Sequence, residues 1–424
     1  MKKKYKLILI TFVLTLLGGL VYANFAGSER NIETQLEHLY TVDDPQFTRS
    51  MGLLLGPSIV GGNKTTELLN GDQIFPSMLE AIRGAKKTVL FETYIYWSGD
   101  VGKEFAQALA DRAANGVKVH VLLDWIGSAK AEGESLEMMK KAGVEVELYH
   151  PLRWYNLARM NNRTHRKLLI VDGQIGFTGG VGIAPIWTGN AQDPDHWRDT
   201  HFKVEGPVVA QMQSVMLDNW SKTTGKVLHG PDYFPPLKPV GNQAGQMFAS
   251  SPSAGSESML MMYLLAITAS TRSIDLSSAY FVPDELTRKA LVAAMKRGVR
   301  LRIITPGKHM DADTVRRASR GLWGDLLQAG AEMYEYQPTM FHTKAMIVDG
   351  RMTSVGSTNF DVRSFVLNDE ANLNIYDQAF AERQTKIFED DLKQSRRITH
   401  EEWLNRPLKT KALEHFAALF GALL

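Results

Sequence analysis

The chain has 424 residues, which is more than one ordinary hydrophobic core supports, so we expect two domains or two fused halves. Its 48 lysines and arginines nearly balance its 46 aspartates and glutamates, and a net charge of +2 by itself indicates no class of partner. The chain has no cysteine, which excludes disulfides, thiolate catalysis and cysteine metal sites.

Lysines at four of the first six positions precede an apolar run from Leu7 to Val21. A positive flank before an apolar run is typical of a segment that enters a membrane with its lysines in the cytoplasm. We expect residues 1–26 to form a single uncleaved anchor, with the catalytic part outside the cytoplasm. The run is short against the roughly 20 residues of a usual span. Signal cleavage after Ala23 and a segment lying along the inner leaflet are the alternatives.

Residues 35–240 are expected to form the first half. Within it, 87–96 has the pattern of a buried strand, a helical stripe ends at Gly116, and 117–123 alternates as a second strand. Strand–helix–strand units of this kind predict parallel pairing with right-handed crossovers.

The pattern H-x-K-x4-D follows, as His165, Lys167 and Asp172, and leads into a glycine turn that contains Gly180. Side chains two apart on a strand share a face, so the histidine and the lysine are expected to point the same way. The aspartate comes after an apolar run, and we assign it to fixing a turn more than to bond making. The stretch 152–171 around the motif is basic and has no acid, which would attract an anionic substrate. A solvated basic loop is the alternative.

Residues 241–406 are expected to form the second half, after a proline-rich connector at 229–239. The segment 273–280 matches the first buried strand, a second helical stripe ends at Gly298, and 299–304 alternates. The two halves should face each other around a pseudo-twofold axis, because that arrangement brings their motifs together.

The second copy of the pattern consists of His342, Lys344 and Asp349, and its glycine turn continues through Ser357 to Asn359. Backbone N–H groups of the two turns, with the Ser357 and Asn359 side chains, are candidate phosphate-binding groups. Gly180 is the matching candidate in the first copy.

Motif and scaffold repeat together. The offset from Gly116 to Gly298 is 182 residues, and that from His165 to His342 is 177. A chance match of an eight-residue pattern would not carry its scaffold with it, so the sequence indicates an internal duplication.

Two carboxylates, Asp199 and Glu370, stand at parallel positions downstream of the motifs, each before an apolar alternating stretch. A catalytic imidazole needs an acidic partner on its other nitrogen, and we expect these two to orient the histidines. Surface carboxylates are the alternative. Tyr94 and Tyr280 end matching strands, where they either line the cleft or belong to the core. At the end of the chain, 407–424 has the pattern of an amphipathic helix, packed on the body or, alternatively, inserted in lipid.

Two histidines and two lysines can surround one phosphodiester. One neutral imidazole can attack phosphorus, the other can protonate the leaving alcohol, and two ammonium groups can offset the charge. Histidines in different protonation states predict a bell-shaped pH profile. The pattern supplies one ligand beside a repelling cation, so we expect neither a metal nor a cofactor. The sequence is symmetric and does not choose the nucleophile.

The two copies resemble the HKD motif of the phospholipase D superfamily, H-x-K-x4-D-x6-G-[SG]-x-N. The second copy matches throughout, whereas Gly182 stands where the first copy should have asparagine. From about 65 to 405 the chain is most similar to the bacterial cardiolipin synthases, notably over the stretches 91–95, 197–201, 204–207 and 278–284. The resemblance implies an α/β fold of two fused halves, each a mixed β-sheet flanked by helices, related by a pseudo-twofold axis.

The resemblance also implies a reaction in the bacterial cell membrane. A phosphatidyl group would pass from one phosphatidylglycerol to the hydroxyl of another through a phosphohistidine, with His165 as nucleophile, His342 as acid and base, and no metal. Phosphatidylglycerol with phosphatidylethanolamine is the alternative pair of donor and acceptor lipids. The expected partners are anionic phospholipids and the membrane, without nucleic acid, and the oligomeric state stays open. The alternatives are a phospholipase D hydrolase, a nuclease of the superfamily and an inactive lipid-binding scaffold, which the intact histidines and lysines disfavour.

Overall fold

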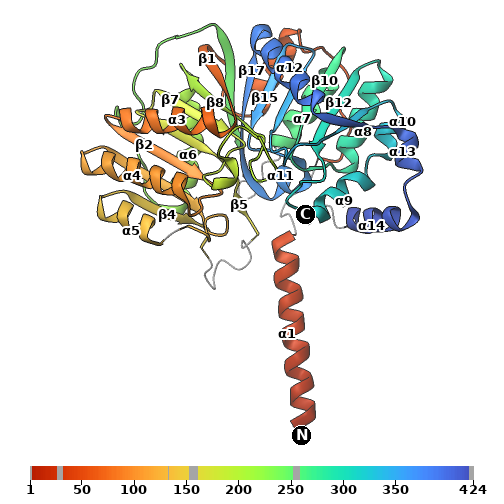
Figure 1. Ribbon diagram of the computed structural model, residues 1–424, viewed down its shortest axis with the longest axis horizontal. Coiled ribbons are helices and arrows are strands. Elements are labelled where there is room, and N and C mark those ends of the chain that lie inside the picture. The colour runs from red at the N-terminus through yellow and green to blue at the C-terminus, as the bar shows by residue number, and fades with distance from the viewer. Residues whose placement is uncertain (1, 26–31, 132, 152–160, 252–257, 420–424) are drawn as a thin grey trace.

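The computed structural model describes residues 2–25, 32–131, 133–151, 161–251 and 258–419. The chain forms one large mixed sheet with helices on its faces, and Figure 1 shows its two halves side by side. The N-terminal half supplies β1 (Val60–Leu69), β2 (Thr88–Thr93), β3 (Lys118–Asp124), β4 (Glu145–Tyr149), β5 (Arg163–Thr164), β6 (Leu168–Val171), β7 (Ile175–Gly179) and β8 (Thr200–Glu205). The C-terminal half supplies β9 (Gln243–Ser250), β10 (Ser273–Ser277), β12 (Arg300–Pro306), β13 (Glu332–Tyr336), β14 (Ala345–Val348), β15 (Met352–Gly356), β17 (Asn368–Tyr376) and β18 (Ser395–Ile398). A separate parallel pair consists of β11 (Phe281–Val282) and β16 (Phe360–Asp361).

The sheet repeats one strand order outward from its centre. On one side the order is β1-β8-β7-β6-β2-β3-β4, and on the other it is β9-β17-β15-β14-β10-β12-β13, with β18 added at the edge. Strands β1 and β9 pair at the centre, and β2-β3-β4 and β10-β12-β13 are parallel in both halves. This order confirms the predicted fold class of two fused halves, each with a mixed sheet.

Helices cover both halves of the sheet. In chain order they are α1 (Lys2–Phe25), α2 (Pro45–Leu54), α3 (Asn70–Gly84), α4 (Asp100–Ala114), α5 (Gly133–Lys141), the 3₁₀ turn η2 (Pro185–Trp187), α6 (Val209–Thr224), α7 (Ser258–Ala269), α8 (Glu285–Lys296), α9 (Asp313–Gly321), α10 (Gly324–Gln328), α11 (Val362–Val366), α12 (Gln378–Lys393), α13 (His400–Leu404) and α14 (Leu408–Ala418). The repeated helices α4 and α8 are followed by Gly116 and Gly298, at φ of +86° and +98°. Only glycine adopts that backbone at low cost, which is why the chain turns there into β3 and β12.

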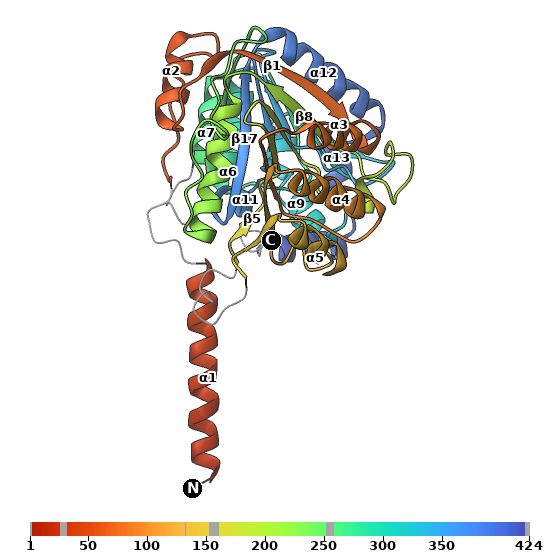
Figure 2. The ribbon, with the colours of Figure 1, turned by 90° about the vertical axis from the view of Figure 1, so that its left-hand side faces the viewer.

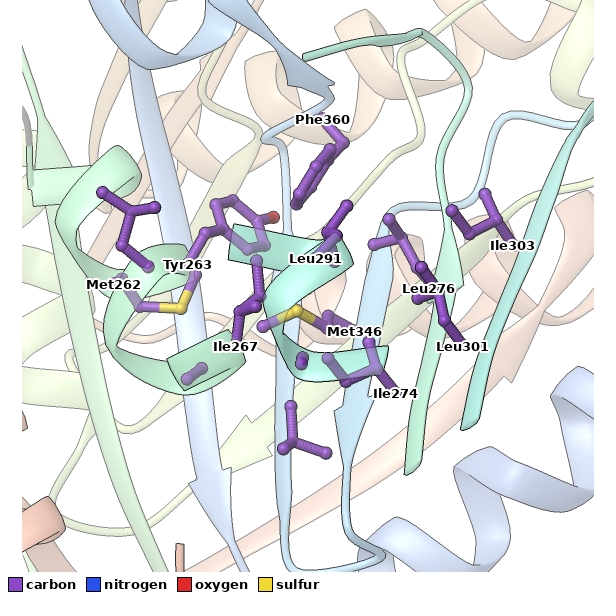
Figure 3. Close-up of a cluster of buried hydrophobic side chains, with 14 of the residues drawn as sticks. Met262, Tyr263, Ile267, Ile274, Leu276, Leu291, Leu301, Ile303, Met346 and Phe360 are labelled. Atoms are coloured by element: carbon purple, nitrogen blue, oxygen red, sulfur yellow. The ribbon is translucent and has the colours of Figure 1, made fainter. Parts of the chain in front are cut away.

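The core of the second half lies between α7, α8 and the sheet. Figure 3 shows side chains of these helices facing those of β10, β12 and β14. The labelled residues are Met262, Tyr263, Ile267, Ile274, Leu276, Leu291, Leu301, Ile303, Met346 and Phe360. Each fully buried apolar side chain of this size contributes about 1.5–3 kcal/mol to stability, so this layer fixes the strands that carry the second motif.

The strands before the cavity are shorter than the sequence predicts. Strand β2 ends at Thr93 and β10 at Ser277, because a hydroxyl then bonds a carbonyl two residues ahead. Thr93 donates to the Ile95 carbonyl (3.2 Å), and Ser278 donates to the Tyr280 carbonyl (2.6 Å). In both halves the backbone therefore leaves the sheet at the same point of the repeat.

The first helix, α1, projects away from the body of the molecule (Figure 2). In the described part of the chain, no helix combines the length and the apolar character that a membrane crossing requires. Lys3, Lys4 and Lys6 lie at its start, and the apolar run from Leu7 to Val21 is shorter than the roughly 20 residues of a usual span. The predicted single N-terminal membrane span is therefore wrong, and the prediction that the catalytic part lies outside the cytoplasm loses its basis.

Candidate active site

The histidines of both motifs line one cavity of about 330 Å³ between the two halves. Its polar lining consists of Tyr94, Arg163, His165, Lys167, Tyr280, Asp311, His342, Asn359, Asp361, Arg363, Ser364 and Asn368. The two motif histidines, from positions 177 residues apart, thus face the same enclosed space.

The histidines are held there by backbone bonds to the opposite half. Strand β5, just before His165, pairs in parallel with the start of β17, and the His165 N–H donates to the Asp369 carbonyl (2.9 Å). In the same way, Arg198 bridges Phe341 in parallel, and the His342 N–H donates to the Arg198 carbonyl (2.8 Å). Each motif is therefore fixed by a segment of the other half.

As a result, each motif histidine is hydrogen-bonded to a carboxylate of the other half, which we call the carboxylate exchange. His165 Nδ1 lies 2.9 Å from Glu370 Oε1, and His342 Nδ1 lies 2.8 Å from Asp199 Oδ2. Both carboxylates are fully buried. Asp199 and Glu370 are the two carboxylates that the sequence predicts as orienting groups, but the sequence does not predict which histidine each one contacts. With Nδ1 engaged, the Nε2 atom of His165 is left for chemistry in the cavity, whereas His342 Nε2 lies 3.1 Å from Lys344 Nζ.

Further donors orient the buried carboxylates. Trp187 Nε1 donates to Asp199 (3.0 Å), as does the Thr200 N–H (2.8 Å). Ser357 Oγ donates to Glu370 (2.5 Å). The hydroxyl of Ser357, predicted to bind phosphate, is thus engaged with a carboxylate in this structure and does not line the cavity.

The other predicted phosphate-binding groups differ from each other. Asn359 lines the cavity, and its Oδ1 has no hydrogen-bond partner within the described ranges. Gly180 lies against Asp199, where any Cβ would clash with the carboxylate, so this glycine permits the Asp199 contact. Its N–H points to the Thr200 carbonyl at 3.4 Å.

The two motif lysines repeat one geometry. Lys167 Nζ donates to the His165 carbonyl, and Lys344 Nζ donates to the His342 carbonyl, both at 2.7 Å. Both ammonium groups are buried, so each is held beside its histidine with donors to spare for an anion.

Burial dominates the electrostatics of the site. It lowers the pKa of His165 to about 4 and, together with the charges of Lys344 and Lys167, lowers the pKa of His342 well below its usual value. Burial also lowers the pKa of Lys167 to about 7 and that of Lys344 to about 8. A phosphate anion in the cavity would oppose all of these shifts, because it favours the protonated forms.

The two orienting carboxylates have opposite pKa shifts. Burial raises the pKa of Asp199 to about 6, although Lys344 opposes the shift. Burial acts on Glu370 as well, but the charge and hydrogen bond of His165 hold its pKa below the usual value. The two histidines therefore meet carboxylates of different basicity, an asymmetry that the duplicated motif does not reveal.

The motif aspartates lie outside the cavity lining. Asp172 accepts the backbone N–H groups of residues 86–88, and Asp349 accepts those of 271–273. Both have positive φ, +52° and +55°. They tie the turn before β2 or β10 to the end of the motif strand, which is a structural task and not contact with substrate.

Several cavity residues were not predicted. Trp187 and Trp197 each have ring centroids 5.3 Å from that of His342. Tyr280 donates to Asp311 at 2.8 Å, and no sequence pattern distinguishes that aspartate. Arg163 belongs to the basic stretch 152–171 that the sequence predicts to attract an anion. Residues 152–160 of that stretch lie outside the described residues. Tyr94 and Tyr280, left open between cleft and core, both line the cavity.

Groups of three or more histidine or acidic side chains close enough to bind a metal are absent from the described part of the chain. The residues that line the cavity and those beside it can supply nucleophilic and acid–base chemistry from two imidazoles, and two ammonium groups stand next to these rings.

The chain is similar to known proteins in sequence and in structure. A family described as "Cardiolipin synthase, PLD-like domain" matches residues 78–193 and 263–392. A cardiolipin synthase of Geobacillus kaustophilus is 34% identical over 365 residues, covering 85% of this chain and 72% of that protein. The major cardiolipin synthase ClsA of Bacillus subtilis is 32% identical over 448 residues, covering 98% and 92%. The crystal structure of a phosphatidylserine synthase from Haemophilus influenzae covers 89% of this chain and all of its own (100%), with a TM-score of 0.65 at 14% identity, and so shares the fold.

The turn anchors give a testable prediction. Asp349→Ala removes a buried carboxylate that accepts three backbone N–H groups, so we expect a loss of about 2 kcal/mol or more of stability and a clearly lower Tm. Thermal unfolding followed by circular dichroism measures it. The control is Asp390→Ala, an exposed aspartate paired only with Lys393, which should leave the Tm unchanged. An unchanged Tm for Asp349→Ala would contradict the structural assignment.

Proposed function

The chain belongs to the family of bacterial cardiolipin synthases with a phospholipase D-like domain, and on that premise we propose that it is a phosphatidyltransferase that makes cardiolipin from phosphatidylglycerol. The observation that carries the proposal is the convergence of His165 and His342, each with a buried carboxylate and a lysine, on one cavity. We propose that residues 35–240 and 241–406 act as the two halves, since each supplies one histidine–lysine pair and one exchanged carboxylate.

In the first half-reaction, His165 Nε2 attacks the phosphorus of a bound phosphatidylglycerol. A bond from nitrogen to phosphorus forms, and the bond from phosphorus to the glycerol oxygen breaks. His342 gives its proton to that oxygen, so glycerol leaves as a neutral alcohol. The neutral state that burial imposes on His165 leaves its lone pair free for this attack.

In the second half-reaction, His342 takes the proton from a hydroxyl of a second phosphatidylglycerol. That oxygen attacks the phosphorus of the phosphohistidine, and the nitrogen–phosphorus bond breaks. Cardiolipin is formed, and neutral His165 and protonated His342 are regenerated. His342 starts protonated although burial lowers its pKa, because the substrate anion and Asp199 favour its imidazolium form. Acid–base help of this kind is worth about 10²–10⁴ in rate.

The lysines and the exchanged carboxylates support both half-reactions. Lys167 and Lys344 stabilise the negative charge on the phosphoryl oxygens, and Asn359 adds a side-chain donor in the cavity. Asp199 and Glu370 hold the imidazoles with Nε2 toward phosphorus. Ser357 and Gly180 act through these carboxylates, one by a hydrogen bond and the other by allowing close approach.

The substrates of this reaction are anionic phospholipids, and we propose that the protein takes them from a bilayer surface. Helix α14 packs on α9 through buried Glu414, which accepts from Arg320 (2.9 Å), and exposes Leu408, Leu413 and Phe416. Figure 1 shows α14 beside α9 at the end of the molecule where α11 also lies. Since α9 and α11 line the cavity, a bilayer in contact with α14 would keep acyl chains in lipid while head groups enter the site.

The bilayer contact can be measured directly. Phe416→Ser should weaken sedimentation with phosphatidylglycerol vesicles several-fold, because it removes exposed apolar surface from α14. The matched control Phe234→Ser changes an exposed phenylalanine of the connector and should bind like the wild type. Equal binding of both variants would contradict the contact.

The reaction itself is tested with phosphatidylglycerol vesicles and mass spectrometry. We expect the wild type to form cardiolipin and glycerol, and His165→Ala and His342→Ala each to lose at least about 10³-fold in kcat, because each ring has a step that no other group performs. Phosphatidic acid as the main product would indicate a hydrolase. A near-normal rate in either variant would contradict the shared site.

The buried lysines predict the alkaline side of the pH profile. Their lowered pKa values, about 7 and about 8, mean that the empty site loses its cations as pH rises through this range. We therefore expect kcat/KM to fall above about pH 8, and the fall in kcat to lie at higher pH because the bound anion favours ammonium. Initial rates from pH 5.5 to 9.5 provide the measurement, and a kcat/KM that stays constant to pH 9.5 would contradict it.

A further inference from the structure

Two arginines line the active-site cavity and lack carboxylate partners. Arg163, only 8% exposed, begins β5 two residues before His165, and Arg363 lies on α11 after the second glycine turn. Among the described residues, Arg163 donates one long bond, to the Asn162 carbonyl (3.5 Å), and Arg363 donates to Asn161 Oδ1 (2.9 Å). Within the described ranges, neither guanidinium forms an ion pair.

Arg163 is buried and Arg363 is half-buried, and both differ from two paired buried arginines of the protein. Arg198 forms a two-pronged contact with Asp391 (2.8 and 2.9 Å), and Arg302 forms one with Asp275 (2.7 and 2.8 Å). A buried cation without such a partner is costly. Burial lowers the pKa of Arg163, and the like charge of Arg363 adds to this effect. The pair is therefore matched in charge to an anion that enters the cavity from outside.

The acids that line the cavity, and Asp124 beside it, are engaged with other groups. Asp124, which attracts Arg163, accepts the N–H groups of residues 126, 127 and 164. Asp361 accepts the Ser364 N–H at the start of α11, and Asp311 accepts the Tyr280 hydroxyl. The guanidinium groups thus keep unused donors in the fork geometry that suits a phosphate.

The proposed reaction brings two phosphates to the site. Lys167, Lys344 and the histidines surround the phosphorus that is transferred, but the acceptor phosphatidylglycerol carries a second phosphodiester three carbons from its attacking hydroxyl. That second anion must also leave water when the hydroxyl enters the cavity, and it needs counter-charge there.

We propose that Arg163 and Arg363 bind the phosphate of the acceptor phospholipid. The inference rests on the proposed function and adds to it a determinant of acceptor choice. One arginine comes from each half, so the acceptor phosphate sits across the same junction as the transferred one. The pair favours a phosphate-bearing alcohol over water or a neutral alcohol, because only the former gains two charge-assisted contacts.

A competition between acceptors tests this assignment. Wild type, Arg163→Gln and Arg363→Gln are incubated with phosphatidylglycerol vesicles and ethanol, a small acceptor without a phosphate, and cardiolipin and phosphatidylethanol are quantified together by mass spectrometry. We expect the ratio of cardiolipin to phosphatidylethanol to fall at least 10-fold in each variant. Arg351→Gln, which changes a partly exposed arginine paired with Asp43, is the matched control and should keep the wild-type ratio.

The outcomes separate this inference from the proposed function. Equal loss of both products would overturn it and indicate a role in donor binding or folding. If a glutamine variant does not fold, Arg363→Lys keeps the charge without the fork and should lower the same ratio by a smaller factor; an unchanged ratio would overturn the assignment. Wild-type protein that makes phosphatidylethanol but no cardiolipin would contradict the proposed function itself.

Discussion

The structure depends on an exchange of carboxylates across its centre. His165 of the first half is held by Glu370 of the second, and His342 of the second half is held by Asp199 of the first. The exchange is built on two short parallel contacts, β5 with β17 and Arg198 with Phe341, which tie each motif to the other half through the backbone. Separating the halves would leave buried charges and N–H groups without partners, at a cost of several kcal/mol each. The duplicated chain therefore forms one site, which neither half completes alone.

This constraint explains why two copies of one pattern can take different roles. Both lysines bond the carbonyl of their own histidine, and Lys344 Nζ also lies 3.0 and 3.1 Å from the two ring nitrogens of His342. The surroundings differ as well: His342 packs against both Trp187 and Trp197, and its partner Asp199 has a pKa raised to about 6, whereas the pKa of Glu370 stays below its usual value. A nucleophile and a proton carrier need such a difference, and the packing around the motif supplies it.

The sequence was sufficient for the repeat, the mixed sheet, the motif faces and the choice of Asp199 and Glu370, because each depends on local spacing. It did not reveal which carboxylate meets which histidine, since that depends on β5, two residues long and paired some 200 positions away. The engagement of Ser357 with Glu370 and the place of Asp311 in the cavity likewise arise from tertiary contacts without a local pattern. Positive charge followed by an apolar run predicts a membrane span at the N-terminus, but the apolar run is shorter than the roughly 20 residues of a usual span.

The central claim is that His165 and His342 act on the same phosphorus atom, one as nucleophile and the other as acid and base. The most direct measurement is acid quenching of the protein within milliseconds of mixing with lipid radiolabelled at the donor phosphate, followed by peptide mapping. The account predicts transient label on the peptide that contains His165, which disappears as product forms. Label on the His342 peptide, or product that forms with no labelled protein at any time, would contradict it.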